Sequence, residues 1–341
     1  MGRRSDAKAS RRAGRFALTP LHGHDEAVTT FHGSWAAGRL HHAWLISGGE
    51  GVGKALFADK AALRILAEAA GPPVDAAGLD VPDNHPTARL IEAGSHPDLV
   101  RLERLPRDTG ADLARSITVD QVRGLSKLFS TTASMSPWRV VVIDSIDDLE
   151  RAAANALLKN LEEPPAKCLF LLVSHTPERL LPTIRSRCRQ LRLSTLGDDA
   201  MMAALRGALP DADDQEIKAL SEAGEGSPGR AVAFRGLEVD VMNKALSEIA
   251  SRGDPTNARR SALAQSLALK SAQPRYEIFL RRAPSLIAEL AKQRRGDPLA
   301  EALATWERAS NLAASAARLS LDPQSVTFEL AGMLASLAPV R

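Results

Sequence analysis

The feature that most constrains the fold is the glycine-rich stretch SGGEGVGKA at residues 47–55, which joins two apolar segments of different character. Before it, residues 42–46 (HAWLI) form a short, largely apolar run of the kind found in a buried strand. After it, residues 56–69 are rich in Ala and Leu and predict a helix. A strand that passes through glycines directly into a helix is the local structure that a phosphate-binding loop requires.

The glycines fit the P-loop pattern G-x-x-x-x-G-K at its three fixed positions, Gly48, Gly53 and Lys54. In such a loop the glycines, here also Gly51, allow positive φ and let backbone N–H groups surround a phosphate. The lysine would reach the outer phosphates. The next residue is normally a Ser or Thr that ligates Mg²⁺, and here it is Ala55. The alternative is a glycine-rich turn with an incidental lysine.

A second element of nucleotide chemistry is predicted at residues 140–144 (VVVID), an apolar run that ends in Asp144. This pattern is typical of a Walker B strand, whose aspartate steadies Mg²⁺. The alternative is a carboxylate that caps the following helix. Working ATPases of this type usually have a Glu next, to polarise the attacking water, and here the residue is Ser145.

Two catalytic parts are therefore missing together, the metal-binding hydroxyl and the water-orienting carboxylate. A missing base alone lowers a rate by about 10² to 10⁴. We expect the isolated chain to hydrolyse ATP slowly or not at all and to require no cofactor. Weak binding of ATP or ADP stays open.

Other segments predict the rest of an α/β domain. Between 149 and 161 an apolar residue recurs every four positions, which predicts a helix ended by Pro164-Pro165. Residues 118–130 predict a helix that begins with a capping box, and 70–88, rich in Pro, Gly and Asp, predict an inserted loop. A further candidate strand lies at 99–103, and two apolar runs, typical of parallel strands covered on both faces, lie at 139–143 and 168–173.

After about residue 195 the strand signal disappears, and the sequence becomes Ala/Leu-rich helix interrupted by Gly and Pro. We therefore predict an α/β P-loop domain with a parallel sheet, followed by a small helical domain and an all-helical C-terminal domain. The predicted bounds are 1–17 for a basic tail, 18–194 for the α/β domain, 195–250 for the small helical domain and 251–341 for the last domain.

Composition narrows the class of protein. The first 15 residues hold six basic side chains and one acidic one, which predicts a disordered tail that is passive or weakly attracted to DNA; a transit peptide has a similar composition. The chain has no apolar run of 18 residues, so we expect no membrane-spanning helix. The two cysteines, Cys168 and Cys188, form no C-x-x-C pair, which favours a reducing cytoplasm and no metal site.

Residues 185–189 (RSRCR) place three arginines at alternate positions. Such a cluster is usually a solvated face. An arginine offered across a subunit boundary can instead stabilise the charge that develops on a neighbour's γ-phosphate. Spacing alone leaves both readings open.

Several stretches together resemble the bacterial clamp-loader subunits of the AAA+ family, and among them the delta-prime type of DNA polymerase III subunit. The resemblance covers about residues 18–235 and is densest at 138–193. It implies an AAA+ core, a helical lid and a collar that joins five subunits, gamma/tau and delta among them, into a ring that places a sliding clamp on primed DNA. The stretches that carry it are HHAWLISGGEGVGK, SHPDLVRL, ITVDQVRGL, RVVVIDSIDDLERAAANALLKNLEEPP and TPERLLPTIRSRCRQLRL.

The resemblance also implies roles for single residues. Delta-prime members are typically poor or inactive ATPases that act as a rigid stator, and their Ser-Arg-Cys motif carries an arginine finger. The match assigns this motif to Ser186, Arg187 and Cys188, with Arg187 directed at ATP in an adjacent gamma/tau subunit. The alternatives are an active gamma/tau-like motor and a stand-alone DNA-binding AAA+ relic.

Departures from the family pattern carry further expectations. Many relatives have four zinc-binding cysteines after the P-loop helix, whereas residues 68–98 contain none, so no zinc is expected. In the lid, the usual position of a nucleotide-sensing arginine is Gly229, with Arg230 one place later, so sensing by the lid is not expected. Asn155 and Lys159 are candidates to face DNA, because the family places basic residues nearby; the alternative is a solvated helix face.

Overall fold

A computed structural model of the chain describes residues 20–106, 113–130, 134–237, 239–319 and 321–339. The predicted basic tail at 1–17 lies outside these residues. The chain divides into two compact units. The first comprises Met1–Pro210 with Gly226–Arg230, and the second comprises Asp211–Glu225 with Ala231–Arg341. The predicted bounds of three domains stay predictions.

The first unit is built on a five-stranded parallel sheet with the strand order β2-β3-β4-β1-β5. All four predicted strands are present. Three of them, β1, β3 and β4, fill the middle of a sheet that is covered on both faces, whereas β2 lies at one edge. The fifth strand was not predicted from the sequence. The bounds are β1 Ala43–Ser47, β2 Leu99–Glu103, β3 Arg139–Asp144, β4 Cys168–Ser174 and β5 Arg189–Arg192.

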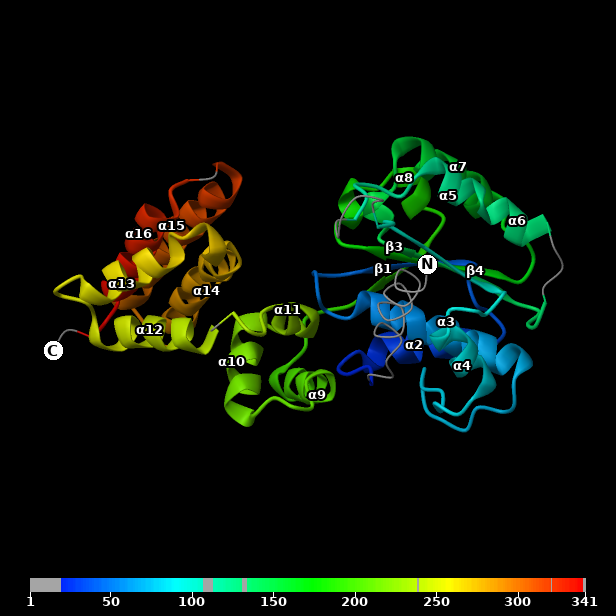
Figure 1. Cartoon of the computed structure of the whole chain (residues 1–341), viewed down its shortest axis with the longest axis horizontal. Coiled ribbons are helices and arrows are strands. Elements are labelled where there is room, and N and C mark those ends of the chain that lie inside the picture. Colours follow the sequence, from blue (N-terminus) through cyan, green and yellow to red (C-terminus); the bar gives the residue numbers. More distant parts are fainter. Residues whose placement is uncertain (1–19, 107–112, 131–133, 238, 320, 340–341) are drawn as a thin grey trace, which may run out of the picture. The chain divides into compact units, whose positions relative to one another are not determined.

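Helices cover both faces of this sheet (Figure 1). On one face lie α2 (Asp25–Ala36), α3 (Lys54–Ala70) and α4 (Pro86–Glu92). On the other lie α5 (Val119–Arg123), α6 (Leu125–Ser130), α7 (Arg151–Glu162) and the short α8 (Pro182–Arg185). Two sequence predictions need correction. The predicted loop at 70–88 ends earlier, because the His85 side chain caps a helix that has Pro86 in its first turn. The helix predicted over 118–130 is two helices that meet at Gly124.

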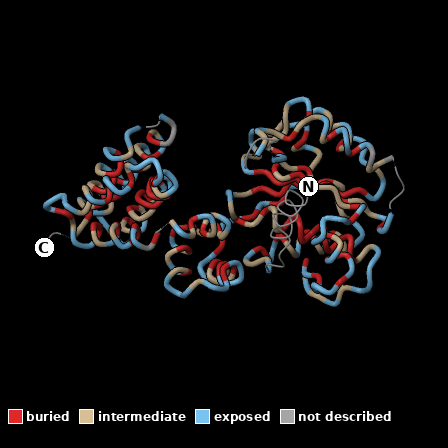
Figure 2. Tube along the Cα trace, in the orientation of Figure 1, coloured by how far each residue is buried: buried red, intermediate tan, exposed pale blue. Residues whose placement is uncertain are grey.

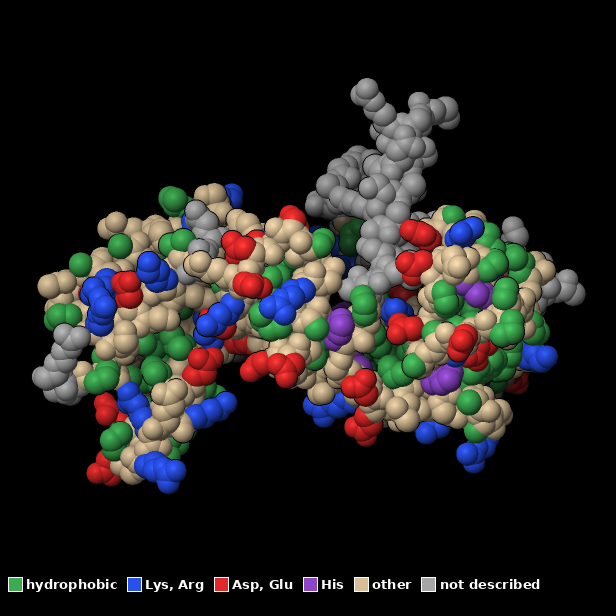
Figure 3. Space-filling model, turned by 90° about the horizontal axis from the view of Figure 1, so that it is seen from below, with side chains coloured by type: hydrophobic (Ala, Val, Ile, Leu, Met, Phe, Trp, Pro, Cys, Tyr) green, Lys and Arg blue, Asp and Glu red, His purple; other side chains and the backbone are tan. Residues whose placement is uncertain are grey.

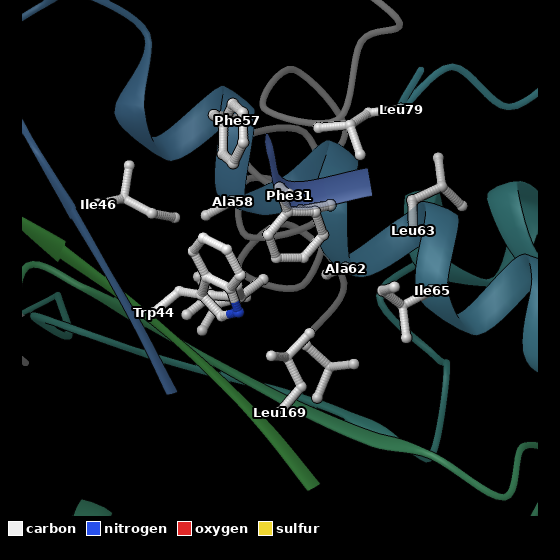
Figure 4. Packing of buried hydrophobic residues seen from close by; sticks show 14 of the residues in the cluster. Phe31, Trp44, Ile46, Phe57, Ala58, Ala62, Leu63, Ile65, Leu79 and Leu169 are labelled. Carbon is white, nitrogen blue, oxygen red and sulfur yellow. The ribbon is translucent and has the colours of Figure 1, made fainter. Parts of the chain in front are cut away.

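The sheet has a hydrophobic core on each face, and buried residues run through the centre of this unit (Figure 2). Under α2 and α3, Phe31 packs edge-on against Trp44, with ring centroids 5.0 Å apart, and against Phe57 (Figure 4). All three rings are fully buried. Burying each large apolar side chain contributes about 1.5–3 kcal/mol, so this packing fixes α3, and with it the glycine loop, against the sheet.

In the described residues after β5, the regular secondary structure is helical. The bounds are α9 Asp198–Ala208, α10 Asp214–Gly224, α11 Pro228–Ala233, α12 Val239–Arg252, α13 Ala258–Leu267, α14 Gln273–Lys292, α15 Asp297–Leu319 and α16 Pro323–Ala335. Within the described residues the second unit contains no strand. The predicted fold class, a P-loop α/β domain with a parallel sheet followed by helical regions, is confirmed. On the face shown in Figure 3, acidic and basic side chains are interspersed, which suits the small net charge of +3.

Candidate functional site

The glycine loop has the backbone shape that its sequence predicts. It follows β1 directly and ends where α3 begins at Lys54. Gly48, Gly51 and Gly53 have φ of +150°, +79° and +105°. Strand, loop and helix therefore form the predicted P-loop architecture at the carboxyl ends of the parallel strands.

The lysine of the loop is turned back onto the loop itself. Lys54 Nζ donates hydrogen bonds to Gly48 O at 2.8 Å and to Gly49 O at 2.6 Å, and the residue is buried. Burial lowers the pKa of Lys54 and outweighs the opposing charges of nearby carboxylates, Asp147 and Asp144 foremost. The ammonium group that would reach a phosphate is thus bonded to the chain's own carbonyl oxygens.

Two other carbonyls of the loop also have partners within the first unit. Gly51 O accepts a hydrogen bond from Gly229 N at 2.8 Å, and Val52 O accepts one from His24 Nε2 at 2.8 Å. A Cβ on Gly229 would lie 3.1 Å from both Cα and O of Gly51, and a Cβ on Gly51 would lie 2.6 Å from Arg230 N. At the predicted position of a sensing arginine, a glycine therefore packs its backbone on the loop.

Asp144, the predicted Walker B carboxylate, lies at the end of β3 and is bound by an arginine of the neighbouring strand. Arg101 Nη2 lies 2.6 Å from Asp144 Oδ2, and the same guanidinium pairs with Asp59 of α3 and with Glu103 of β2. Burial alone would lower the pKa of Arg101, but Asp59, Asp144 and Glu103 outweigh it and raise that pKa.

The carboxylates that follow Asp144 are engaged in structural bonds. Ser145 Oγ donates to Asp148 at 3.1 Å. Asp147 accepts hydrogen bonds from the end of β4 and the residues after it: Ser174 Oγ at 3.0 Å, His175 N at 2.6 Å, Thr176 N at 3.2 Å and Thr176 Oγ1 at 2.9 Å. Burial raises the pKa of Asp147, and these bonds outweigh it and lower the pKa.

These residues do not fit the magnesium ion that a working P-loop site uses. Ala55 offers no oxygen ligand, and Asp144 is bound to a guanidinium. Among the residues that the structure describes, no group of three or more His, Cys, Asp or Glu side chains is arranged to hold a metal ion. Cys168 and Cys188 are both free thiols.

The Ser186-Arg187-Cys188 segment lies between α8 and β5. Arg187 Nη1 donates to Thr183 O at 3.0 Å, and Arg187 Nη2 forms an ion pair of 2.8 Å with Glu162, the last residue of α7. The Arg187 side chain is 34% exposed and that of Glu162 is 48% exposed. The arginine is therefore accessible from solvent and held by a single surface carboxylate.

Ser186 and Cys188, the neighbours of Arg187 in the motif, differ in burial. Ser186 is exposed, and its Oγ donates to Thr183 O at 3.1 Å. Cys188 is half-buried against the core under α7, and burial raises the pKa of its thiol to about 12. The thiol is therefore neutral at physiological pH, which suits packing rather than chemistry.

The sheet separates this segment from the glycine loop. β1 and β5 are parallel, with Trp44 opposite Arg189 and Ser47 opposite Arg192. The loop follows the last residue of β1, whereas Arg187 precedes the first residue of β5. Since each strand residue advances about 3.3 Å, the two lie at opposite ends of the strands. We call the end with the glycine loop the carboxyl edge of the sheet and the end with Arg187 the amino edge. Arg187 cannot serve the loop of its own chain in this fold.

Three residues of this region were missed by sequence reasoning: Arg101, Glu162 and His24. Arg101 gave a signal that could have been used, since it is a charge within a strand of a sheet predicted to be covered on both faces. Asp59, inside an Ala/Leu-rich helix, was its matching signal. Glu162 and His24 gave none, because their partners are fixed only by the tertiary fold.

The candidate DNA-facing residues lie on α7. Asn155 and Lys159 are both exposed and one helical turn apart, and Arg151 continues the same face a turn earlier. No helix in the described ranges is long and apolar enough to cross a membrane.

Comparison with known proteins identifies the family. A family model described as "DNA polymerase III, delta subunit" matches residues 23–197, about half of the chain. The chain belongs to this family. Its resemblance to clamp-loader subunits is thereby confirmed.

Individual relatives are subunits of DNA polymerase III in other organisms. DNA polymerase III subunit delta' of Pseudomonas aeruginosa is 37% identical over 201 residues, which are 58% of this chain and 57% of that protein. Subunit tau of Salmonella typhimurium is 32% identical over 209 residues, or 60% of this chain and 30% of that protein. The chain thus matches little more than half the length of the first relative.

Among solved structures, the RuvB Holliday junction branch migration motor of Thermotoga maritima aligns with 92% of this chain and 90% of that chain. The identity is 15% and the TM-score is 0.42.

Proposed function

We propose that this chain is a delta-prime-type subunit of a DNA polymerase III clamp loader, and that it supplies Arg187 to the ATP site of a neighbouring subunit. One observation carries the proposal. Lys54 is bonded to carbonyls of its own loop and Asp144 to Arg101, while Arg187 is solvent-accessible at the opposite ends of the strands.

The chemistry assigned to Arg187 is stabilisation of negative charge. A guanidinium brought to a γ-phosphate neutralises the charge that develops during hydrolysis, a contribution of about 10³ to 10⁵ in rate. For this, Arg187 must exchange Glu162 for the phosphate. An exposed ion pair contributes only about 0–1 kcal/mol, so this exchange is inexpensive.

The proposed partners follow from the relatives. Delta', tau and gamma subunits of DNA polymerase III are all similar to this chain. We therefore propose assembly with gamma/tau and delta subunits in a hetero-pentamer that acts on a sliding clamp and primed DNA. Lys159 and Arg151, on the exposed face of α7, are the proposed phosphate contacts on DNA.

The test is reconstitution of the complex with Arg187→Ala. Assembly should be intact by size-exclusion chromatography, and ATP hydrolysis at the interface that receives Arg187 should fall by about 10³-fold or more. Arg185→Ala is the matched control, two residues earlier in the same arginine cluster, and should leave hydrolysis unchanged. Equal rates for the wild type and Arg187→Ala would reject the arginine-finger role.

A second candidate, an active gamma/tau-like motor, is favoured by the similarity to tau. Robust DNA-stimulated ATP hydrolysis by the isolated chain would support it. The bonds made by Lys54 and Asp144 argue against it, since both groups would have to leave internal partners. A stand-alone DNA-binding relic would instead fail to co-purify with gamma/tau and delta subunits.

A further inference from the structure

The most heavily charged buried cluster in the first unit surrounds Arg101 of β2. Its side chain is 14% exposed, and its partners Asp59 and Asp144 are 8% and 14% exposed. The guanidinium touches three carboxylates, those of Asp59, Glu103 and Asp144. An arginine so placed in a strand is costly to bury unless its charge is matched, and here it is matched by groups from three separate elements.

The sheet register explains why these groups meet. Glu103 lies opposite Asp144 and Arg101 lies opposite Val142 in the parallel pair of β2 and β3. Since side chains two residues apart in a strand share a face, Arg101 and Glu103 point to the same side. Val142 belongs to the core cluster under α3, so this is the side that α3 covers, and Asp59 of α3 completes the cluster from above.

The chemistry of a guanidinium suits this position. It is planar, always charged, and presents five donors, so one group can bind several carboxylates at fixed angles. Asp144 is the carboxylate that a working site would direct at Mg²⁺. Here one of its oxygens is 2.6 Å from Arg101 Nη2, a charge-assisted hydrogen bond in a poorly solvated place.

We propose that Arg101 is the built-in counter-ion of Asp144 and takes over, as part of the chain, the electrostatic role that Mg²⁺ has in a working P-loop site. The cluster then balances Asp144 with no metal, and Asp144 is withdrawn from metal binding. This role of Arg101 is independent of whether Arg187 acts on a neighbour.

The experiment compares thermal unfolding of the full chain with Arg101→Met, Asp144→Asn and the double variant. Each is measured with millimolar MgCl₂ and with NaCl at the same ionic strength. Arg104→Met is the control, since Arg104 forms a more exposed pair with Asp148 nearby. Circular dichroism establishes that each variant is folded.

We expect Arg101→Met to lower Tm by roughly 5 to 10 °C, because it leaves the buried carboxylates of Asp59 and Asp144 without their cation. Asp144→Asn should lower Tm by less, because Arg101 keeps Asp59 and Glu103 as partners. The double variant should be no less stable than the worse single variant, and Arg104→Met should shift Tm by roughly 2 °C or less. Mg²⁺ should leave the Tm of the wild type within about 1 °C of the NaCl value, because a ligand that does not bind the native state does not stabilise it.

Two results would overturn the proposal. One is a rise in the Tm of the wild type with Mg²⁺ that is absent in Asp144→Asn, which would make Asp144 a metal ligand. The other is additive losses in the double variant, which would mean that Arg101 and Asp144 do not depend on each other. If Arg101→Met does not fold, the Mg²⁺ comparison between the wild type and Asp144→Asn still decides.

Discussion

Cationic side chains lie at both ends of the parallel strands, and they differ in burial and in bonding partners. At the carboxyl edge, Lys54 is bonded to Gly48 O and Gly49 O, and Arg101 is paired with buried carboxylates. At the amino edge, Arg187 is one-third exposed and held by Glu162, which is itself half exposed. Both edges belong to the same compact unit.

The difference decides which edge is ready for a phosphate. A phosphate that approaches Lys54 must displace two hydrogen bonds to backbone carbonyl oxygens, and a hydrogen bond that involves a charged group contributes about 1.5–3 kcal/mol. A phosphate that approaches Arg187 displaces an exposed pair of about 0–1 kcal/mol. Residues that match a phosphate-binding motif therefore do not establish phosphate binding until their partners in the fold are known.

The largest expected loss of stability comes from disturbing the close packing of the glycine loop against residues 229–230. Gly51→Ala should destabilise the fold by about 2–4 kcal/mol, because φ is +79° and the new Cβ would lie 2.6 Å from Arg230 N. Gly49→Ala is the matched control, since its Cβ would make an ordinary contact of 3.6 Å with Val52. Urea unfolding of both variants is the measurement, and equal losses would contradict a tight contact between the loop and residues 229–230.

The contribution of Asp147 to stability at the carboxyl edge should depend on pH. Asp147→Asn should cost about 1.5–3 kcal/mol at pH 7, since hydrogen bonds to a carboxylate at Ser174, His175 and Thr176 are weakened. Because the pKa of Asp147 is lowered in the fold, its contribution is complete above the unfolded value of about 3.9. The contribution is lost as pH falls through the lower native pKa.

Urea unfolding as a function of pH measures this effect. The stability difference between the wild type and Asp147→Asn should be constant from pH 7 to about pH 5 and shrink below about pH 4. A difference that is the same at low pH would mean that the ionised carboxylate is not what holds the residues after β4.

The smallest expected effect is at the amino edge. Glu162→Gln should change stability by less than about 1 kcal/mol, because the pair with Arg187 is exposed. In the reconstituted complex it should leave ATP hydrolysis unchanged or raise it a few-fold, since Arg187 is released. Glu163→Gln is the neighbouring control. A loss as large as that of Arg187→Ala would show that Glu162 is needed to position the arginine.

Three of the strands that the sequence predicted are mainly apolar, such as β4, which is buried throughout. The fourth, β2, lies at the edge of the sheet and still has three apolar residues among its five. β5 escaped prediction because it is a short edge strand with the sequence RQLR, in which only Leu191 is buried. Its charges are typical of an edge that must not pair with another chain. With one apolar residue among four, β5 lacks the apolar run from which a strand is predicted.

The candidate site was predictable where chemistry depends on residue type alone. Ala55 and Ser145 lack the groups that Mg²⁺ and water require, whatever the fold. The pairing of Arg101 with Asp144 was not predictable. It joins two residues that are 43 positions apart in the sequence, and they meet only because β2 and β3 pair in one register. Glu162 and Arg187 likewise meet only because α7 ends near the start of β5.

The most direct test of the account compares the two edges in one assay. Lys54→Met and Arg187→Ala are each assembled with gamma/tau and delta subunits, and ATP hydrolysis is measured after size-exclusion chromatography has established intact assembly. The account predicts that Lys54→Met hydrolyses ATP at the wild-type rate, whereas Arg187→Ala loses about 10³-fold at the interface it serves. Loss of hydrolysis in Lys54→Met with Arg187→Ala unaffected would contradict it.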